Sequence, residues 1–223
     1  MPQKIKLKRV NYAYDRLKAD ILASVMAPGY QAPEPEIADL LGMSRTPVRE
    51  ALIRLQTEGM LDLVPRRGAL VKGLSSADVR EIHEVLAGLE SELCINLAMR
   101  GFSLAEIDAC NELMAEMSQA EEAADFTRWL EKDLELRTKL FELHGNGRLE
   151  RTSRLMLDQL YRGRLALLNE VGKVDVSHEE LKTVLAAVYA GDGLRAGQLA
   201  ASYRKQACDV LIERLEEADL LYV

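Results

Sequence analysis

The sequence predicts a mainly α fold in two parts: a small N-terminal unit of three helices and a β-hairpin, and an antiparallel all-α bundle of six to seven helices. First, apolar residues recur at intervals of three and four through most of the 223 residues, as on helices that bury one face. Second, Leu, Ala and Glu are abundant while aromatic residues make up only 5%, a composition that favours helix. Third, residues 61–72 contain two short apolar runs around a turn with Pro and Gly, which is typical of a hairpin.

Composition limits the class of protein. Contents of 48% hydrophobic and 29% charged residues are those of an ordinary soluble protein. No apolar run approaches the roughly 18 residues that a membrane span needs, and residues 1–14 lack the apolar core of a signal peptide. Cys94, Cys110 and Cys208 are odd in number and show no CxxC spacing, which argues against disulfides or a zinc knot. We therefore expect a cytoplasmic location, no membrane partner and three buried thiols.

The formal net charge of −7 is unevenly distributed along the chain. Residues 1–73 carry 12 Lys and Arg against 8 Asp and Glu, whereas residues 74–223 carry 17 against 28. A basic front on an acidic body indicates that only the front meets a polyanion. The order of elements also changes at this point, so we expect one domain over residues 1–73 and a second over residues 74–223.

The first two helices are separated by a loop that contains Pro28, Gly29 and Pro33. Residues 12–26 place four apolar side chains at helical spacing: Leu17, Ile21, Leu22 and Val25. Residues 34–43 form a short second helix that Gly42 ends, since glycine suits a left-handed helix end. The apolar side of this short helix is expected to comprise Ile37, Leu40 and Leu41.

A third helix and a hairpin complete the unit. Ser44 can cap the helix, Pro47 lies in its first turn, where a missing N–H has little effect, and the helix continues to Gly59. Strands over residues 61–64 and 69–72 are joined by a turn at residues 65–68. Helix, short helix, tight turn, helix and hairpin follow one another in the order of a winged helix-turn-helix.

In such a unit the second helix of the pair lies in the major groove of DNA. Its inner face is expected to comprise Val48, Leu52 and Leu55. Arg45 and Arg49 lie four residues apart and project from one outer face, where an arginine can bind O6 and N7 of a guanine or a phosphate. Thr46 is short enough to reach a backbone oxygen or a thymine methyl group.

The wing offers a second contact, because Arg66 and Arg67 at the hairpin tip can reach the neighbouring groove and Gly68 would let the backbone come close. The alternative is a solvated arginine face with no partner, but the turn, the cap, the proline and the wing all favour DNA. One helix reads too few base pairs for useful specificity, so we expect a homodimer on a double-stranded, pseudo-palindromic operator.

The stretch "PGYQAPEPEIADLLGMSRTPVREALIRLQTEGMLDLVPRRGALV" resembles the DNA-binding domain of the GntR family of bacterial transcription regulators, most specifically in "SRTPVREAL". The resulting set of expected DNA-binding residues is Ser44, Arg45, Thr46, Arg49, Arg66, Arg67 and Gly68. Many members carry a DNA-contacting arginine just after the glutamate that matches Glu34. This sequence has Pro35 there, so we expect that phosphate contact to be missing.

The second part reads as helices almost throughout. Six segments have helical periodicity: residues 75–100, 103–123, 125–144, 148–171, 177–192 and 193–218. The first is expected to bury Val79, Ile82, Val85, Leu86, Leu89, Leu93 and Leu97. Ser75 and Ser103 are candidate caps, and Gly101 ends the first helix. Short connections between antiparallel helices make a bundle.

This half resembles the ligand-sensing FCD domain of the FadR-like subfamily, in "D..L.L.LFELHGN" and "SHEEL..VLAAVYAGD". The resemblance implies a homodimer whose bundle holds a small organic acid, often beside a divalent metal. It also implies that the ligand changes how the two DNA-binding units meet the operator, with repression as the usual outcome.

The metal ligands of that family are only partly present. Asp133 and His178 match the first and third ligand positions, whereas Arg137 and Tyr203 replace histidines at the second and fourth. A protonated arginine repels a cation, so we predict no cofactor and disfavour a divalent metal. Leu86 also replaces a family arginine. We expect Asp133, Arg137, His178 and Tyr203 to bind the effector, with Arg137 holding its carboxylate in place of the metal.

The sequence allows other roles for these side chains. His178 could be only a polar residue at a helix start, and Asp133 with Arg137 a plain surface pair. His83 and His144 are expected to be surface or cap residues rather than ligands.

Two other functions compete with an effector-controlled regulator. An architectural DNA-binding protein without an effector would have a featureless bundle interior, whereas buried polar groups at residues 133, 137, 178 and 203 would favour a sensor. A DNA-tethered helical enzyme is disfavoured, because no Gly-rich phosphate loop, nucleophile elbow or catalytic triad spacing is present.

Overall fold

The computed structural model describes residues 2–172 and 178–218. Its internal contacts divide the chain into two compact units, and the boundary along the sequence falls between Gly73 and Leu74. Within the described residues no helix is both long and apolar enough to cross a membrane.

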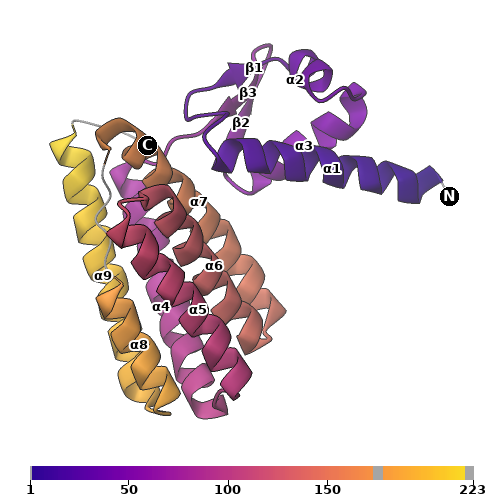
Figure 1. Cartoon of the computed structure of the whole chain (residues 1–223). Helices are drawn as coiled ribbons and strands as arrows, with labels where there is room; N and C mark the ends of the chain where they lie inside the picture. The colour runs from indigo at the N-terminus through magenta and orange to yellow at the C-terminus, as the bar shows by residue number, and fades with distance from the viewer. Residues whose placement is uncertain (1, 173–177, 219–223) are drawn as a thin grey trace. The chain divides into compact units, whose positions relative to one another are not determined.

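The N-terminal unit contains three helices and a small antiparallel sheet (Figure 1). Its elements in order are α1 (Pro2–Leu22), β1 (Gln31–Ala32), α2 (Glu34–Leu40), α3 (Arg45–Thr57), β2 (Leu61–Val64) and β3 (Gly68–Val71). In the sheet, β3 lies between β1 and β2, and Leu63 pairs with Ala69. The winged helix-turn-helix that the sequence predicts is confirmed.

Apolar stripes of α1 and α3 make the core of this unit. α1 contributes Ala13, Leu17 and Ile21, each at most 1% exposed, and α3 packs against α1. The apolar face of α3 comprises Pro47, Val48, Ala51, Leu52 and Leu55, as its spacing requires. The opposite face of α3 is thereby turned away from the core.

Some boundaries and burials differ from the sequence expectation. α1 begins at Pro2 and ends at Leu22, because the chain turns left-handed at Ser24 (φ 56°) and carries Val25 out of the apolar stripe, leaving it 70% exposed. Leu40 is 64% exposed, since the short α2 directs only Ile37 and Ala38 fully inward. The apolar spacing that groups Val25 and Leu40 with the buried residues of their helices therefore does not hold for these two side chains.

The C-terminal unit is all-α (Figure 1). Its helices are α4 (Ser76–Arg100), α5 (Leu104–Glu122), α6 (Phe126–His144), α7 (Gly147–Val171), α8 (Glu179–Tyr189) and α9 (Gly193–Glu217). The described residues thus form the helical bundle that the sequence predicts. Val85 is 42% exposed, so its place in the predicted core is wrong.

Side-chain caps fix where several of these helices begin. Ser75 and Ser103 both form capping boxes, in which the serine hydroxyl accepts from the N3 backbone and the N3 carboxylate accepts from the serine N–H. The glutamate or aspartate at N3 also suits the positive end of the helix dipole. Both serines were expected as caps from the sequence.

The bundle core is continuous through its helices. Trp129 and Phe141 of α6 are among its largest buried side chains, and all three cysteines are buried free thiols, as expected. α4 and α9 approach closely at Gly197 of α9 and Ile95 of α4. If Gly197 carried a Cβ, that atom would lie only 2.7 Å from Cγ1 of Ile95. The absence of a side chain at Gly197 therefore allows the helices to meet.

Candidate nucleic-acid interface and buried charge cluster

The exposed face of α3 begins with three of the expected DNA-binding side chains. Arg45, Thr46 and Arg49 are all exposed, while the apolar face of the same helix is buried. Ser44 is the N-cap residue and makes no side-chain capping hydrogen bond. Its hydroxyl is therefore not committed to the helix and remains free to meet a phosphate beside the positive helix end.

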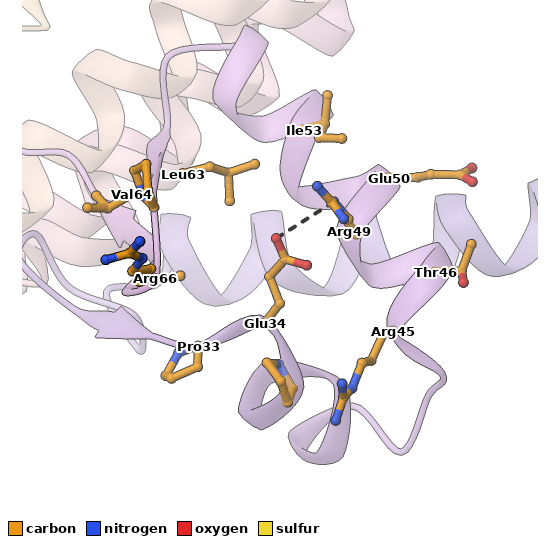
Figure 2. Close-up of a pocket in the computed structure, with 13 residues that line it drawn as sticks. Pro33, Glu34, Arg45, Thr46, Arg49, Glu50, Ile53, Leu63, Val64 and Arg66 are labelled. Carbon is orange, nitrogen blue, oxygen red and sulfur yellow. Dashed lines mark ion pairs between the residues drawn. The ribbon is translucent and has the colours of Figure 1, made fainter.

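A hollow of about 910 Å³ separates α3 from the hairpin. Figure 2 shows Arg45, Thr46 and Arg49 on one side and Arg66 with Val64 on the other. Its apolar lining comprises Pro33, Pro35, Ile53, Leu63, Val64 and Pro65. The hollow thus combines apolar surface with cations on opposite sides.

Two carboxylates, Glu34 and Glu50, also line the hollow, and Glu34 lies next to one of these cations. Glu34 Oε1 is 3.8 Å from Arg49 Nε, with side chains 29% and 67% exposed, respectively (Figure 2). Such an exposed pair contributes little to stability. Arg49 can therefore exchange Glu34 for a phosphate or a guanine at small cost.

The hairpin tip presents exposed arginines on a tightly constrained backbone. Arg66 has a left-handed φ of 67°, and Arg67 N–H donates to Val64 O across the turn at 3.0 Å. Gly68 has φ 86°, and a Cβ there would lie 2.1 Å from Ala32 O of β1. Because β1 passes so close to β3, a residue with a side chain would not fit at position 68, which explains the glycine there.

The bundle contains a cluster of five charged side chains from four helices, which we call the charge cluster: Glu90 of α4, Asp133 and Arg137 of α6, Arg164 of α7 and Arg204 of α9. Arg137 Nε donates to Asp133 Oδ1 at 2.8 Å, and its Nη1 donates to Glu90 Oε1 at 3.2 Å. Arg164 Nη1 donates to Asp133 Oδ2 at 2.8 Å. Arg204 binds Glu90 with two nitrogens.

Neighbouring charges decide the ionisation of this cluster. Burial alone would raise the pKa of the Glu90 and Asp133 carboxyls, but the adjacent arginines outweigh it and hold both pKa values below their usual range. Burial likewise opposes the charge of Arg137, yet Asp133 and Glu90 raise its pKa. All these groups are therefore ionised at neutral pH.

Three of the four expected effector residues come together here. Asp133 and Arg137 are each 4% exposed, which excludes the alternative of a surface pair, and the Arg137 guanidinium carbon lies 5.0 Å from the Tyr203 ring centroid. His178 lies instead at the N-cap of α8, beside Glu121 and Glu179. Among the residues that the structure describes, the charged neighbours of His178 are these two glutamates, which do not belong to the charge cluster.

His83 is not the surface or cap residue that the sequence suggested. It is 4% exposed, and its Nδ1 lies 3.0 Å from the backbone oxygen of Arg204. His83 occupies an inward position on α4 between Val79 and Leu86, both fully buried. The apolar residues around it indicated burial more reliably than its own polarity.

Sequence reasoning missed three members of the charge cluster: Glu90, Arg164 and Arg204. Each stands where an apolar stripe would place a core residue; Arg204, for instance, lies between Ala200 and Cys208, which are both buried. A lone charge inside an apolar helical stripe was therefore the signal that could have located them.

These residues do not fit a divalent cation. Both oxygens of Asp133 accept from guanidinium groups, and the cationic Arg137 stands at an expected ligand position. Nor do the described residues include any group of three or more His, Cys, Asp or Glu side chains placed to hold a metal ion. A divalent cation here would be repelled by three arginines, and the two carboxylates that could attract it are already paired with them.

Comparison with known proteins relates both units to families. Residues 10–71 match the family described as bacterial regulatory proteins, gntR family, and residues 81–205 match the FCD domain. An uncharacterized HTH-type transcriptional regulator of Agrobacterium vitis, in the TAR-I ttuE-ttuC' intergenic region, is 48% identical over 91 residues, 41% of this chain and 53% of that protein.

Two further relatives extend the comparison. The HTH-type transcriptional repressor RspR of Escherichia coli (strain K12) is 32% identical over 106 residues, 48% of this chain and 45% of the repressor. The chain thus spans about half the length of these curated relatives. The solved structure of E. coli McbR/YncC has the same fold, with a TM-score of 0.77 at 23% identity over 92% of this chain and 98% of that one.

Proposed function

The chain belongs to the gntR family of bacterial regulatory proteins and carries an FCD domain, and on that premise we propose that it regulates transcription by binding a DNA operator through α3 and the wing. The relatives described above are named as transcription regulators rather than enzymes. This agrees with the sequence, which offers no set of catalytic residues.

One observation carries the proposal: exposed arginines stand on both sides of the hollow between α3 and the hairpin. Arg45 and Arg49 line one side and Arg66 the other. A helix in the major groove and a wing in the neighbouring groove would place the DNA backbone across this hollow. The apolar lining would then cover sugar atoms.

The acting species is a homodimer on a pseudo-palindromic operator, since one α3 helix reads too few base pairs to separate an operator from the rest of a genome. Repression is the regulatory sign that we propose, supported by the name of the relative RspR. An architectural role without any effector is the competing function.

The test begins with selection of binding sites from random duplexes, followed by titration of the selected site. Arg45→Ala and Arg49→Ala should each weaken binding by about 1–3 kcal/mol where the lost contact is to a base, roughly fivefold to 150-fold. Arg154→Ala, a partly exposed arginine of the bundle, is the control and should bind normally. Unchanged affinity in both α3 variants would exclude this reading of the helix.

The bundle is proposed to sense a small organic acid through Arg137. The support is a buried guanidinium at the position of a family metal ligand, with Tyr203 against it and Asp133 orienting it. A fixed cation whose Nη2 donor is still unused can bind a carboxylate oxygen without a metal.

Screening small carboxylates for release of the operator should give a response that a chelator leaves intact. Arg137→Ala should abolish this response, and the stability of the variant must be measured alongside, because it leaves Glu90 with one partner fewer. If the chelator abolished release of the operator, the hypothesis that Arg137 holds the carboxylate in place of a metal would be excluded.

A further inference from the structure

The charge cluster carries more positive than negative charge. Three guanidinium groups face two carboxylates, and arginine stays protonated in proteins. Because both carboxylates are ionised, as their lowered pKa values require, the net charge is three minus two, or +1.

The neighbours of the cluster within residues 2–172 and 178–218 leave this balance unchanged. His83 contacts Arg204, but burial and the charge of Arg204 lower its pKa to about 3, so the imidazole is neutral. The aromatic rings of Tyr203 and Trp129 lie against Arg137 and Arg164 and carry no net charge. Glu131 acts on Tyr161 nearby, but its side chain is exposed and water screens it.

Water has little access to the excess charge. Arg137 and Arg204 are each 4% exposed, and Arg137 Nη2 has no hydrogen-bond partner within the part of the chain that the structure describes. A buried charge without a counter-charge, and a buried N–H without an acceptor, are both unfavourable. Both deficits would be removed by one acceptor with a negative charge.

A void of about 20 Å³ lies at the arginine side of the cluster. Its lining comprises Leu130, Asp133, Leu134, Arg137, Leu157, Leu160, Tyr161, Arg164 and Arg204. This volume suits one particle of about the size of water, and chloride is only slightly larger. Asp133 is the one anionic group of the lining, and its two oxygens already accept from Arg137 and Arg164.

We propose that this void binds a small monovalent anion of the size of chloride, held by Arg137, Arg164 and Arg204. The side chain of Arg164 is 18% exposed, which gives an ion a route from solvent. The inference rests on the proposed function only for its regulatory meaning: one carboxylate oxygen of an organic acid would displace the resident anion. The charge balance calls for an anion whether or not such an acid exists.

Crystals of the full chain grown in sodium bromide give the direct test. Bromide replaces chloride chemically and scatters anomalously, so an anomalous peak among the three guanidinium groups is the expected result. Density at this place without an anomalous signal would show a water molecule and would overturn the proposal.

Two variants that shift the charge in opposite directions give the test in solution. Arg164→Gln lowers the net charge to zero and should remove the stabilisation that sodium chloride gives over sodium methanesulfonate, a salt with a bulkier anion and no carboxylate, at equal ionic strength. Glu90→Gln raises the net charge to +2 and should tighten the apparent chloride affinity roughly tenfold or more. Arg154→Gln, on the same helix but outside the void, should behave like the unaltered protein.

A loss of stability alone would affect both variants in the same direction, whereas the anion predicts opposite chloride responses. Identical chloride responses in all four proteins would overturn the proposal even if both variants are less stable. Because no DNA or organic acid is present, the result is independent of operator binding. A halide site without any carboxylate response would refute the proposed effector and leave this inference standing.

Discussion

The imidazole of His83 is kept neutral by its surroundings. Its Nδ1 lies 3.0 Å from the Arg204 carbonyl oxygen, and because a carbonyl only accepts, Nδ1 carries the proton. Burial, followed by the positive charge of Arg204, lowers the pKa of His83 from 6.5 to about 3. A proton would therefore bind this residue far more readily in the unfolded chain than in the folded one.

We expect this difference to make stability depend on pH. Because the folded pKa is the lower one, the contribution of His83 is complete above pH 6.5 and is lost as pH falls towards about 3, by up to about 1.4 kcal/mol per pH unit. His83→Gln retains a donor for the carbonyl and removes the titration. Urea unfolding over this range should give a shallower pH dependence for the variant.

His144→Gln is the matched control, because His144 is half-buried at the end of α6. It controls for a histidine-to-glutamine exchange elsewhere in the bundle. A pH profile of His83→Gln that runs parallel to that of the unaltered chain would show that the interpretation of His83 as a neutral, buried imidazole is wrong.

At the scale of elements, the contact between β1 and the wing depends on one glycine. Gly68 has φ 86°, and an added Cβ would meet Ala32 O at 2.1 Å, whereas Gly29, with φ 84°, has open space around it. The two positions share the backbone conformation that disfavours a side chain. They differ in the space for a Cβ, which would collide with Ala32 O at position 68 and with nothing at position 29.

Gly68→Ala should therefore destabilise the N-terminal unit by about 2–4 kcal/mol, and Gly29→Ala by about 1–2 kcal/mol. The chain's one tryptophan, Trp129, lies in the bundle, so its fluorescence reports the other unit. Hydrogen exchange of the β3 amides is the appropriate measurement. Equal effects of the two substitutions would mean that β1 moves aside freely.

The elements that the sequence predicted well have strong local signals. The start of α3, with Ser44 at the N-cap position and a proline in the first turn, and the capping boxes of α4 and α5 follow from residues within one helical turn, although the Ser44 hydroxyl makes no capping hydrogen bond. β1 has only two residues, Gln31 and Ala32, too few to show a period. It exists because β3 offers it a partner, which is a tertiary effect that local pattern does not contain.

The side chains inside the bundle were harder to predict. When a sequence is matched to a family's ligand positions, the residue that points inward is located only to within one position along the helix. Tyr203 was matched to the last ligand position, but the neighbouring Arg204 is the side chain that pairs with Glu90. Adjacent helical residues differ in direction by about 100°. The apolar stripe through Ala200 and Cys208 identifies Arg204 as the inward residue.

At the scale of the whole molecule, net charge alone would argue against a polyanionic partner. The total is −7, yet residues 1–73 carry 12 cationic against 8 anionic side chains. The proposed attraction to DNA would thus depend on a few local arginines. Such contacts release counterions, and their number appears in the salt dependence of binding.

Arg66→Gln should weaken binding to selected and random duplexes alike and lower the slope of log affinity against log salt by about one, where its contact is to a phosphate. The same holds for Arg67→Gln. Fluorescence anisotropy titrations at several salt concentrations give the slope, and Arg154→Gln should leave it unchanged. If the salt slope of a wing variant equals that of the unaltered protein, the substituted arginine does not contact a phosphate.

The charge cluster restricts how this protein can evolve. Removing one partner of a buried ion pair costs about 3–5 kcal/mol, whereas exchanging a whole buried ion pair or triad for apolar side chains is often neutral or favourable. The former is a large part of the stability of an ordinary domain. Glu90, Arg137 and Arg204 are paired and buried. We therefore expect selection to act against single substitutions at these positions and to tolerate their joint replacement. Descendants of this chain should keep these residues together or lose them together, and their common ancestry can be traced by that shared inheritance.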